Sequence, residues 1–247
     1  MSGHNRWTKI KRKKEAMGAT KGVLFTKLIR ELTIAAKSGG DPDHNARLRS
    51  ALQSAREANI PGETITRAVK KGTGELEGVS FEELTYEGYG PGGVAMMLEI
   101  VTDNKNRTAG DVRNLFTKGG GSMATTGAVS FLFERQGVIP VKPGQSEDKV
   151  MELALDAGAA DVVADGEGGF EIRTDVSSVH TVAKALEGKL PLSAPKMVYL
   201  PKTTVHVEGE TAEKVVRLIE SLEDNDDVQH VYANLELDEK TMDALSA

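Results

Sequence analysis

The side chains of this sequence that are best suited to binding chemistry are the basic residues near its beginning. Residues 1–21 hold seven Lys or Arg and one acidic residue, and the only Trp, Trp7, lies among them. Lysine and arginine bind phosphate groups, and an indole ring stacks on an unpaired base. Because like charges repel, we expect this segment to be extended or mobile in the free protein. The alternative is a solvated tail with Trp7 packed on its own domain.

The positive charge continues to residue 72 and then reverses. Residues 1–72 contain sixteen Lys or Arg and six Asp or Glu, a formal charge of +10. The remaining 175 residues contain fifteen Lys or Arg and thirty-one Asp or Glu, a formal charge of −16. The two parts together give −6 for the whole chain. This asymmetry indicates an anionic partner for the first part of the chain.

Three short helices are expected to position these basic residues. Apolar residues recur at helical spacing over residues 23–37. A second helix is predicted from an Asp41 N-cap to Ile60, and a third from Pro61 to a stop at Gly72. The predicted nucleic-acid-binding residues of the tail and helices are Arg6, Trp7, Lys9, Lys11, Arg12, Lys13, Lys14, Lys21, Lys27, Arg30, Arg49, Arg56, Arg67, Lys70 and Lys71.

A charged face on a single helix usually contacts water and has no binding function. Here the same sign recurs on three helices while the rest of the chain is acidic, which favours a surface for a phosphate backbone. The sequence has no clear helix-turn-helix recognition pattern, so we assign no base-specific contact.

Several long segments of the chain are similar to one protein family. The segments are "RWTKIKRKKEA", "FTKLIREL", "GGDPDHNARLRSAL", "ANIPGETITRAVKKGTG", "YEGYGPGGVAMMLEIVTDNKNRTAGDVR" and "GAVSFLFERQGVI". In their order and spacing they resemble the YebC/PmpR family, over essentially the whole chain. This family includes proteins called probable transcriptional regulators, a quorum-sensing regulator and a mitochondrial translational activator of cytochrome oxidase.

The resemblance implies a helical N-terminal domain and two α/β domains around a cleft. It also implies DNA binding for some members, and for others an action on the ribosome that includes relief of stalling at proline runs. One departure is visible, because the loop before "FTKL" is usually richer in charged residues. Here residues 18–23 leave Lys21 as the lone basic residue, which puts contacts by this loop in doubt.

The predicted fold class is α+β, with a three-helix domain followed by two α/β sandwich-like domains, the third inserted into the second. The predicted domains are residues 1–76, residues 77–139 with 201–247, and residues 140–200. The predicted order helix-strand-strand-helix-strand supports a compact α+β domain over residues 140–200. The last predicted strand of the chain could complete the sheet that begins near Phe81, which would make residues 140–200 an insertion.

Two glycine-rich or polar segments follow the helical part. Residues 88–93 match GxGxxG, but the next eight residues have the length and composition of a strand, so we predict a turn between strands and no dinucleotide site. Residues 103–107 are expected to form a polar loop before a helix over about 108–118. By resemblance to the family's typical segment, the candidate ligand-facing residues of this loop are Asn104, Lys105, Asn106 and Arg107. The alternative is an ordinary solvated loop and helix start.

The remaining features argue against an enzyme, a cofactor or a metal. The five histidines form no HxxxH pair, GxSxG is missing, and the acidic cluster over residues 223–227 is typical of a solvated turn. The chain has no Cys, no apolar h-region in its first twenty residues, and no apolar run of membrane-spanning length. We therefore expect a cytoplasmic, non-enzymatic monomer without membrane contact.

Three functions remain open from the sequence. The first is a DNA-binding transcriptional regulator. The second is a ribosome-associated translation factor that contacts ribosomal RNA, which the tail and Trp7 favour because unstacked bases are bound by stacking. The third is a protein-interaction adaptor, whose function would survive charge reversal of residues 11–14.

Overall fold

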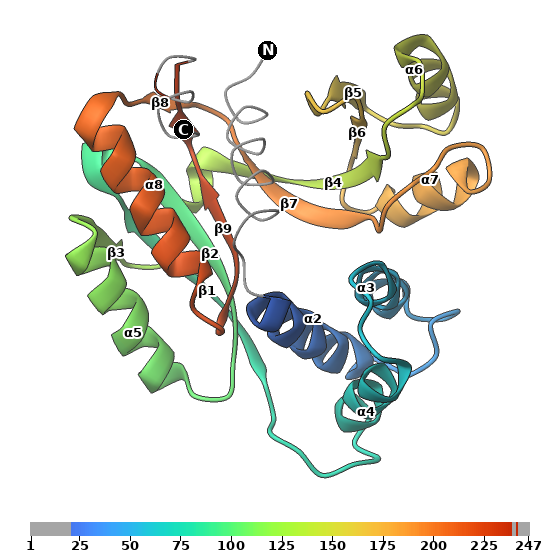
Figure 1. The fold of residues 1–247 in the computed structure, drawn as a ribbon, viewed down its shortest axis with the longest axis horizontal. Helices are drawn as coiled ribbons and strands as arrows, with labels where there is room; N and C mark the ends of the chain where they lie inside the picture. The colour runs from blue at the N-terminus through green and yellow to red at the C-terminus, as the bar shows by residue number, and fades with distance from the viewer. Residues whose placement is uncertain (1–20, 239–240, 242–247) are drawn as a thin grey trace.

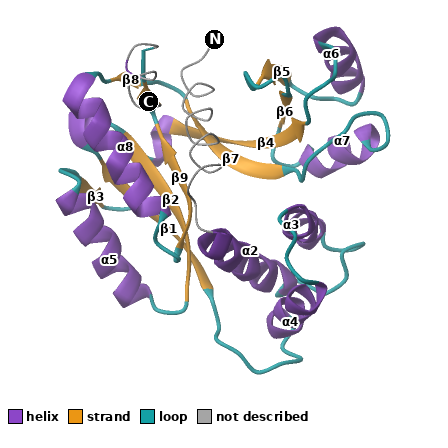
Figure 2. Ribbon diagram, in the orientation of Figure 1, coloured by secondary structure: helices purple, strands orange, loops and turns teal. Residues whose placement is uncertain are grey.

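The structure is a computed structural model that describes residues 21–238 and residue 241. Three helices come first and two four-stranded sheets with their own helices follow, as Figures 1 and 2 show. This arrangement confirms the predicted α+β class. Among the described residues, no helix combines the length and the apolar character that crossing a membrane requires.

The helical part consists of α2 (Lys21–Ala36), α3 (Ala46–Glu57) and α4 (Gly62–Gly72). Helices α3 and α4 both pack against α2. Their shared core is aliphatic, as the periodicity of the sequence predicts. Its buried members are Leu32, Ala35, Ala36, Leu48, Ala51, Ala55, Ile60, Ile65 and Ala68.

The first sheet has the strand order β3-β1-β2-β9. Its strands are β1 (Glu82–Tyr89), β2 (Ala95–Thr102), β3 (Ser122–Ala124) and β9 (Val228–Ala233). The glycine-rich segment between β1 and β2 forms only the short turn η1 (Pro91–Gly93), so the prediction of a turn is confirmed.

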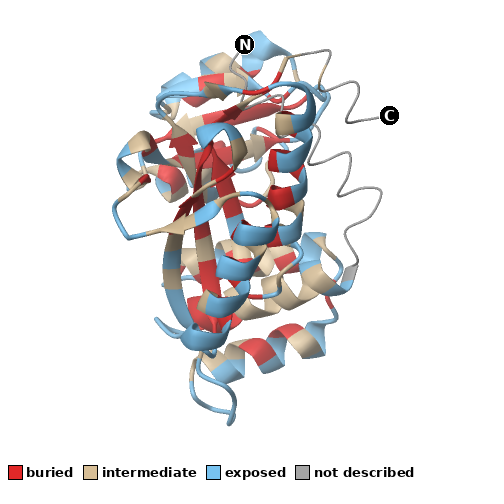
Figure 3. Ribbon diagram, turned by 90° about the vertical axis from the view of Figure 1, so that its left-hand side faces the viewer, coloured by how far each residue is buried: buried red, intermediate tan, exposed pale blue. Residues whose placement is uncertain are grey.

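Both faces of strand β2 are covered, which explains its nearly continuous apolar sequence. Met96, Leu98 and Ile100 face α5 (Lys105–Lys118) and α8 (Gly209–Glu223). Ala95 and Met97 belong to a separate cluster with Phe133 and Tyr232 on the other face. Figure 3 shows the buried residues along the strands and the exposed residues on the outer sides of the helices.

The second sheet has the order β5-β6-β4-β7, and α6 and α7 pack on it. Its elements, with the short η2 (Ser130–Leu132) before them, are β4 (Phe133–Val141), α6 (Glu147–Asp156), β5 (Asp161–Ala164), β6 (Phe170–Thr174), α7 (Val179–Leu186) and β7 (Lys196–Pro201). Two short strands, β8 (Val205–His206) and β10 (Leu235–Glu236), pair in parallel.

The second sheet is inserted into the chain that builds the first. The chain leaves the first sheet after β3, forms β4 to β7, and returns as β9 beside β2. The expectation that the last part of the chain completes the first sheet is confirmed. The residue numbers at which the three domains meet stay a prediction.

Candidate nucleic-acid interface

Five of the predicted phosphate-binding residues are exposed on α3 and α4. Arg49 and Arg56 are seven residues apart on α3, and so share one face of that helix. On α4, Arg67, Lys70 and Lys71 follow helical spacing on the face away from the buried Ile65. These five residues are called the exposed basic set below.

Asn45 determines where α3 begins and how it meets α2. Its Oδ1 accepts a hydrogen bond from the backbone N–H of Leu48 at 3.0 Å, which is the geometry of an N-cap. Its Nδ2 donates to the backbone oxygens of Ala35 at 2.7 Å and Gly39 at 2.8 Å. The prediction that Asp41 caps this helix was therefore wrong: the Asp41 carboxylate accepts from the backbone N–H of Asp43 at 2.9 Å within the preceding turn.

Helix α4 approaches α2 closely at Gly72. A Cβ at this position would collide with the backbone oxygen of Thr33 and the side chain of Ala36. Ile65 and Ala68 of α4 are buried in the same contact. The predicted helix stop at Gly72 is confirmed, and the residue also permits the packing that directs Arg67, Lys70 and Lys71 outward.

Two other predicted residues, Lys27 and Arg30 on α2, make their contacts within the protein. Lys27 Nζ donates to the backbone oxygen of Glu223 at the end of α8. The guanidinium of Arg30 donates to the backbone oxygens of Val101 and Asp226, and it lies 2.6 Å from Asp227 Oδ1. The side chain of Arg30 is only 14% exposed. These two residues join the helical part to the first sheet.

Asp227 is the centre of this junction. Its Oδ2 accepts from Arg107 Nη2 at 2.8 Å, Thr108 Oγ1 at 2.6 Å and Thr102 Oγ1 at 3.2 Å. Burial favours a raised pKa, but the hydrogen bonds from Arg107, Thr108 and Arg30 outweigh it and hold the pKa of Asp227 below its ordinary value. The interpretation of residues 223–227 as a purely solvated turn was therefore wrong for Asp227, which is buried.

A second junction is formed by Arg47 of α3. Its guanidinium donates to Glu31 of α2 at 2.8 and 3.0 Å and to Glu83 of β1 at 2.5 and 3.0 Å. Burial alone would lower the pKa of Arg47. The hydrogen bonds to Glu83 and Glu31 raise it by more than burial lowers it, so the pKa of Arg47 lies above its ordinary value. The hydrogen bonds from Arg47 in turn lower the pKa of Glu83. Arg47 was not among the predicted functional residues, because its partners lie 16 and 36 residues away.

A cavity of about 1130 Å³ lies where the helical part and the two sheets meet. Leu28 of α2, Ile100 of β2 and Pro195 before β7 are among its lining residues. Glu99 also lines it, and burial raises the pKa of this carboxyl group, which accepts a hydrogen bond from Tyr232 at 2.9 Å. His180 of α7 also lines the cavity, and its pKa is lowered because it is partly buried and near Arg49. Arg49 of the exposed basic set is therefore close enough to His180 of the cavity lining to lower its pKa.

The candidate ligand-facing residues of the segment after β2 lie at the start of α5. Asn104 is the N-cap and accepts from the backbone N–H of Arg107 at 3.0 Å. Lys105 lies 2.5 Å from Glu82, and Arg107 contacts Asp103 and Asp227. The prediction that residues 105–107 precede the helix was wrong, because the Asn104 cap starts α5 three residues earlier than expected. Asn106 is exposed in its first turn.

The remaining predicted residues belong to the first segment of the chain. Lys21 is the first residue of α2. The predicted residues that lie outside the described part of the chain are Arg6, Trp7, Lys9, Lys11, Arg12, Lys13 and Lys14.

Comparisons with known proteins cover almost the full chain. The family model described as the TACO1/YebC protein N-terminal domain matches residues 5–75, and the TACO1/YebC second and third domain matches residues 81–235. A protein of Myxococcus xanthus named "Probable transcriptional regulatory protein" is 55% identical over 99% of both chains, and one of the same name from Persephonella marina is 50% identical over all of both chains. The crystal structure of a conserved hypothetical protein from Aquifex aeolicus matches with a TM-score of 0.83 at 47% identity, over 90% of this chain and 92% of that one.

Proposed function

Because the chain belongs to the TACO1/YebC family, we propose that it is a non-enzymatic, nucleic-acid-binding regulator of gene expression. The observation that carries this proposal is the separation of charge. Residues 1–72 have a formal charge of +10 in a chain of net charge −6, and five of their basic side chains are exposed on α3 and α4. Such a surface attracts a phosphate backbone and releases its counterions.

The first candidate target is DNA. Relatives at 50% and 55% identity carry the name "Probable transcriptional regulatory protein", which supports a role in transcription. In this proposal the exposed basic set binds phosphates, and the basic residues of the N-terminal tail extend the contact. Lys27 and Arg30 hold the helical part against the acidic first sheet, and so orient the surface.

The second candidate target is ribosomal RNA. Trp7 lies among the basic residues of the first segment, and an indole ring stacks on bases that are not paired. Duplex DNA presents few such bases, whereas ribosomal RNA presents many in its loops and bulges. The same exposed basic set serves both targets, so its charge does not distinguish them.

Crosslinking of nucleic acid to the protein in growing cells, followed by sequencing of DNA and RNA, tests the proposal. Discrete promoter peaks without ribosomal RNA identify a transcriptional regulator, and enriched ribosomal RNA identifies a translation factor. A control chain in which the exposed basic set is changed to Gln should give fewer crosslinks than the wild type. If the wild type gives no crosslinks above that control, the proposed function is contradicted and a protein-interaction adaptor is favoured.

A further inference from the structure

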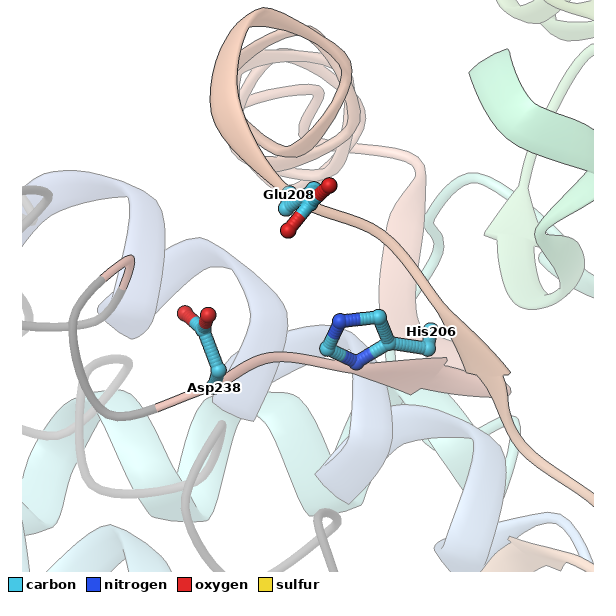
Figure 4. Close-up of side chains that lie close together, drawn as sticks. All are labelled: His206, Glu208 and Asp238. Atoms are coloured by element: carbon cyan, nitrogen blue, oxygen red, sulfur yellow. The ribbon is translucent and has the colours of Figure 1, made fainter.

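Three side chains of residue types that commonly bind metal ions, one His and two carboxylates, lie close together beside β8. His206 lies on β8, Glu208 directly precedes α8, and Asp238 follows β10. One potential donor atom of each lies within 4.8 Å of the others. Figure 4 shows the imidazole ring and the two carboxylates around one space, with His206 and Glu208 on one stretch of chain and Asp238 on another.

The backbone that carries these side chains is held by hydrogen bonds and by the core. Val205 N–H donates to the oxygen of Asn234 at 2.7 Å, and Val207 N–H donates to the oxygen of Glu236 at 3.1 Å. Val207, Leu235 and Leu237 are buried in the core of the first sheet. Because side chains alternate along a strand, this burial directs the neighbouring His206 and Asp238 to the opposite, outer side.

One further hydrogen bond orients the Asp238 carboxylate, and another holds the backbone of Glu208. The Oδ1 atom of Asp238 accepts from the backbone N–H of Thr241 at 2.7 Å. Glu208 is the N-cap of α8, and its backbone oxygen accepts from the N–H of Ala212 at 3.3 Å. Backbone groups that orient a ligating side chain are a regular part of metal sites.

The donor set of one imidazole nitrogen and two carboxylate oxygens selects a class of ion. Ca²⁺ and Mg²⁺ are bound mainly by oxygen, whereas imidazole is a preferred ligand of Zn²⁺ and other first-row transition metals. Two ligands of a tetrahedral Zn²⁺ at about 2.1 Å lie roughly 3.4 Å apart. Because the donor atoms already lie within 4.8 Å of one another, small rotations of the side chains bring them to that spacing.

We propose that His206, Glu208 and Asp238 bind a divalent first-row transition-metal ion, for which Zn²⁺ is the probe. Three protein ligands leave a fourth position for water. The ion joins β8, the start of α8 and the segment after β10, so the unfolding temperature should rise as the concentration of free metal ion increases above its dissociation constant. In Figure 1, β8 lies at the far end of the first sheet from α2–α4. Metal binding should therefore be separable from nucleic-acid binding.

Isothermal titration of ZnCl2 into the full-length, untagged, chelator-treated protein tests this proposal. We expect one equivalent of Zn²⁺ to bind. Loss of a group that merely orients a ligand weakens metal binding by about 10- to 100-fold, so His206→Ala should weaken it by at least about tenfold. The matched control is His44→Ala, since His44 is also exposed and lies 2.7 Å from a carboxylate, that of Asp41. This control should bind like the wild type.

Two further variants guard against a folding defect. Glu208→Gln and Asp238→Asn should each weaken Zn²⁺ binding while the circular dichroism spectrum and nucleic-acid binding stay unchanged. The proposal is overturned if His206→Ala binds Zn²⁺ as tightly as the wild type, which would indicate an adventitious ion only. It is also overturned if Ca²⁺ or Mg²⁺ displaces Zn²⁺ at equal concentration.

Discussion

Arg30 of α2 and Asp227, which are 197 positions apart in the sequence, form an ion pair of 2.6 Å between the helical part and the first sheet. The Asp227 side chain is 6% exposed, so the charge of this carboxylate is almost removed from water. Such a pair holds two parts of a protein in one orientation, because either charge left alone is costly. Together with the contacts of Lys27 and Arg47, this pair holds the helical part, which carries the exposed basic set, against the first sheet.

The first prediction concerns Arg30. Arg30→Ala leaves the buried Asp227 with fewer donors and should destabilise the protein by about 3 kcal/mol. The free energy of unfolding in urea measures the change, and limited proteolysis within residues 73–81 should become faster as the helical part detaches. Arg67→Ala is the control, because Arg67 is 66% exposed and lies 4.0 Å from Glu63. Equal destabilisation of both variants would contradict the assigned role of Arg30.

The second prediction concerns pH. The pKa of Asp227 is lowered in the folded protein, so this group binds protons more readily in the unfolded chain. Its contribution to stability should be complete above about pH 4, the ordinary range for Asp, and should disappear as the pH falls through the lowered folded value. Urea unfolding between about pH 2 and pH 6 measures it. Asp227→Asn should lack this part of the pH dependence, and an unchanged profile in that variant would refute the assignment.

The third prediction concerns the start of α3. Asn45→Ala removes the cap and two further hydrogen bonds from a buried position, and should cost about 1–2 kcal/mol of stability. Asp41→Ala, at the residue that the sequence suggested as the cap, should have little effect because Asp41 is exposed. Thermal unfolding of the two variants compares them directly. The reverse ranking would mean that α3 begins at Asp41.

The fourth prediction concerns the contact of α4 with α2. Gly72→Ala introduces a Cβ against the backbone of Thr33 and should destabilise the helical part by about 1–3 kcal/mol. The matched control is Gly62→Ala at the other end of α4, where no atom lies within 4 Å of the added Cβ. Calorimetry of both variants gives the comparison. Equal unfolding temperatures would show that α4 packs less closely than described.

The sequence predicts the local parts of this structure better than its long-range contacts. Apolar spacing and the Pro61 and Gly72 signals identify the helical part, and the strand-like sequence after Gly93 identifies the turn between β1 and β2. The start of α3 is missed because Asp41 and Asn45 are both suitable caps, and packing against Ala35 selects Asn45.

The junction around Asp227 has no local signal. Its neighbours in the sequence are acidic and typical of a solvated turn, whereas its partners Arg30 and Arg107 are 197 and 120 residues away. Only the folded chain brings these charges together. For the same reason the sequence identifies the basic residues of α2 but does not distinguish Lys27 and Arg30, which face the protein, from the exposed basic set.

The salt dependence of nucleic-acid binding tests most directly whether the exposed basic set binds phosphates. Fluorescence anisotropy with duplex DNA and with a ribosomal RNA fragment, at several salt concentrations, gives the slope of log affinity against log salt. Changing Arg49, Arg56, Arg67, Lys70 and Lys71 to Gln should weaken binding and reduce the slope on DNA by about 0.9 for each phosphate that the variant no longer binds. The control changes five exposed lysines of the acidic part to Gln: Lys118, Lys149, Lys184, Lys189 and Lys214. Only the first variant should show a reduced slope. The same affinity and slope in both variants and the wild type would contradict phosphate binding by the exposed basic set.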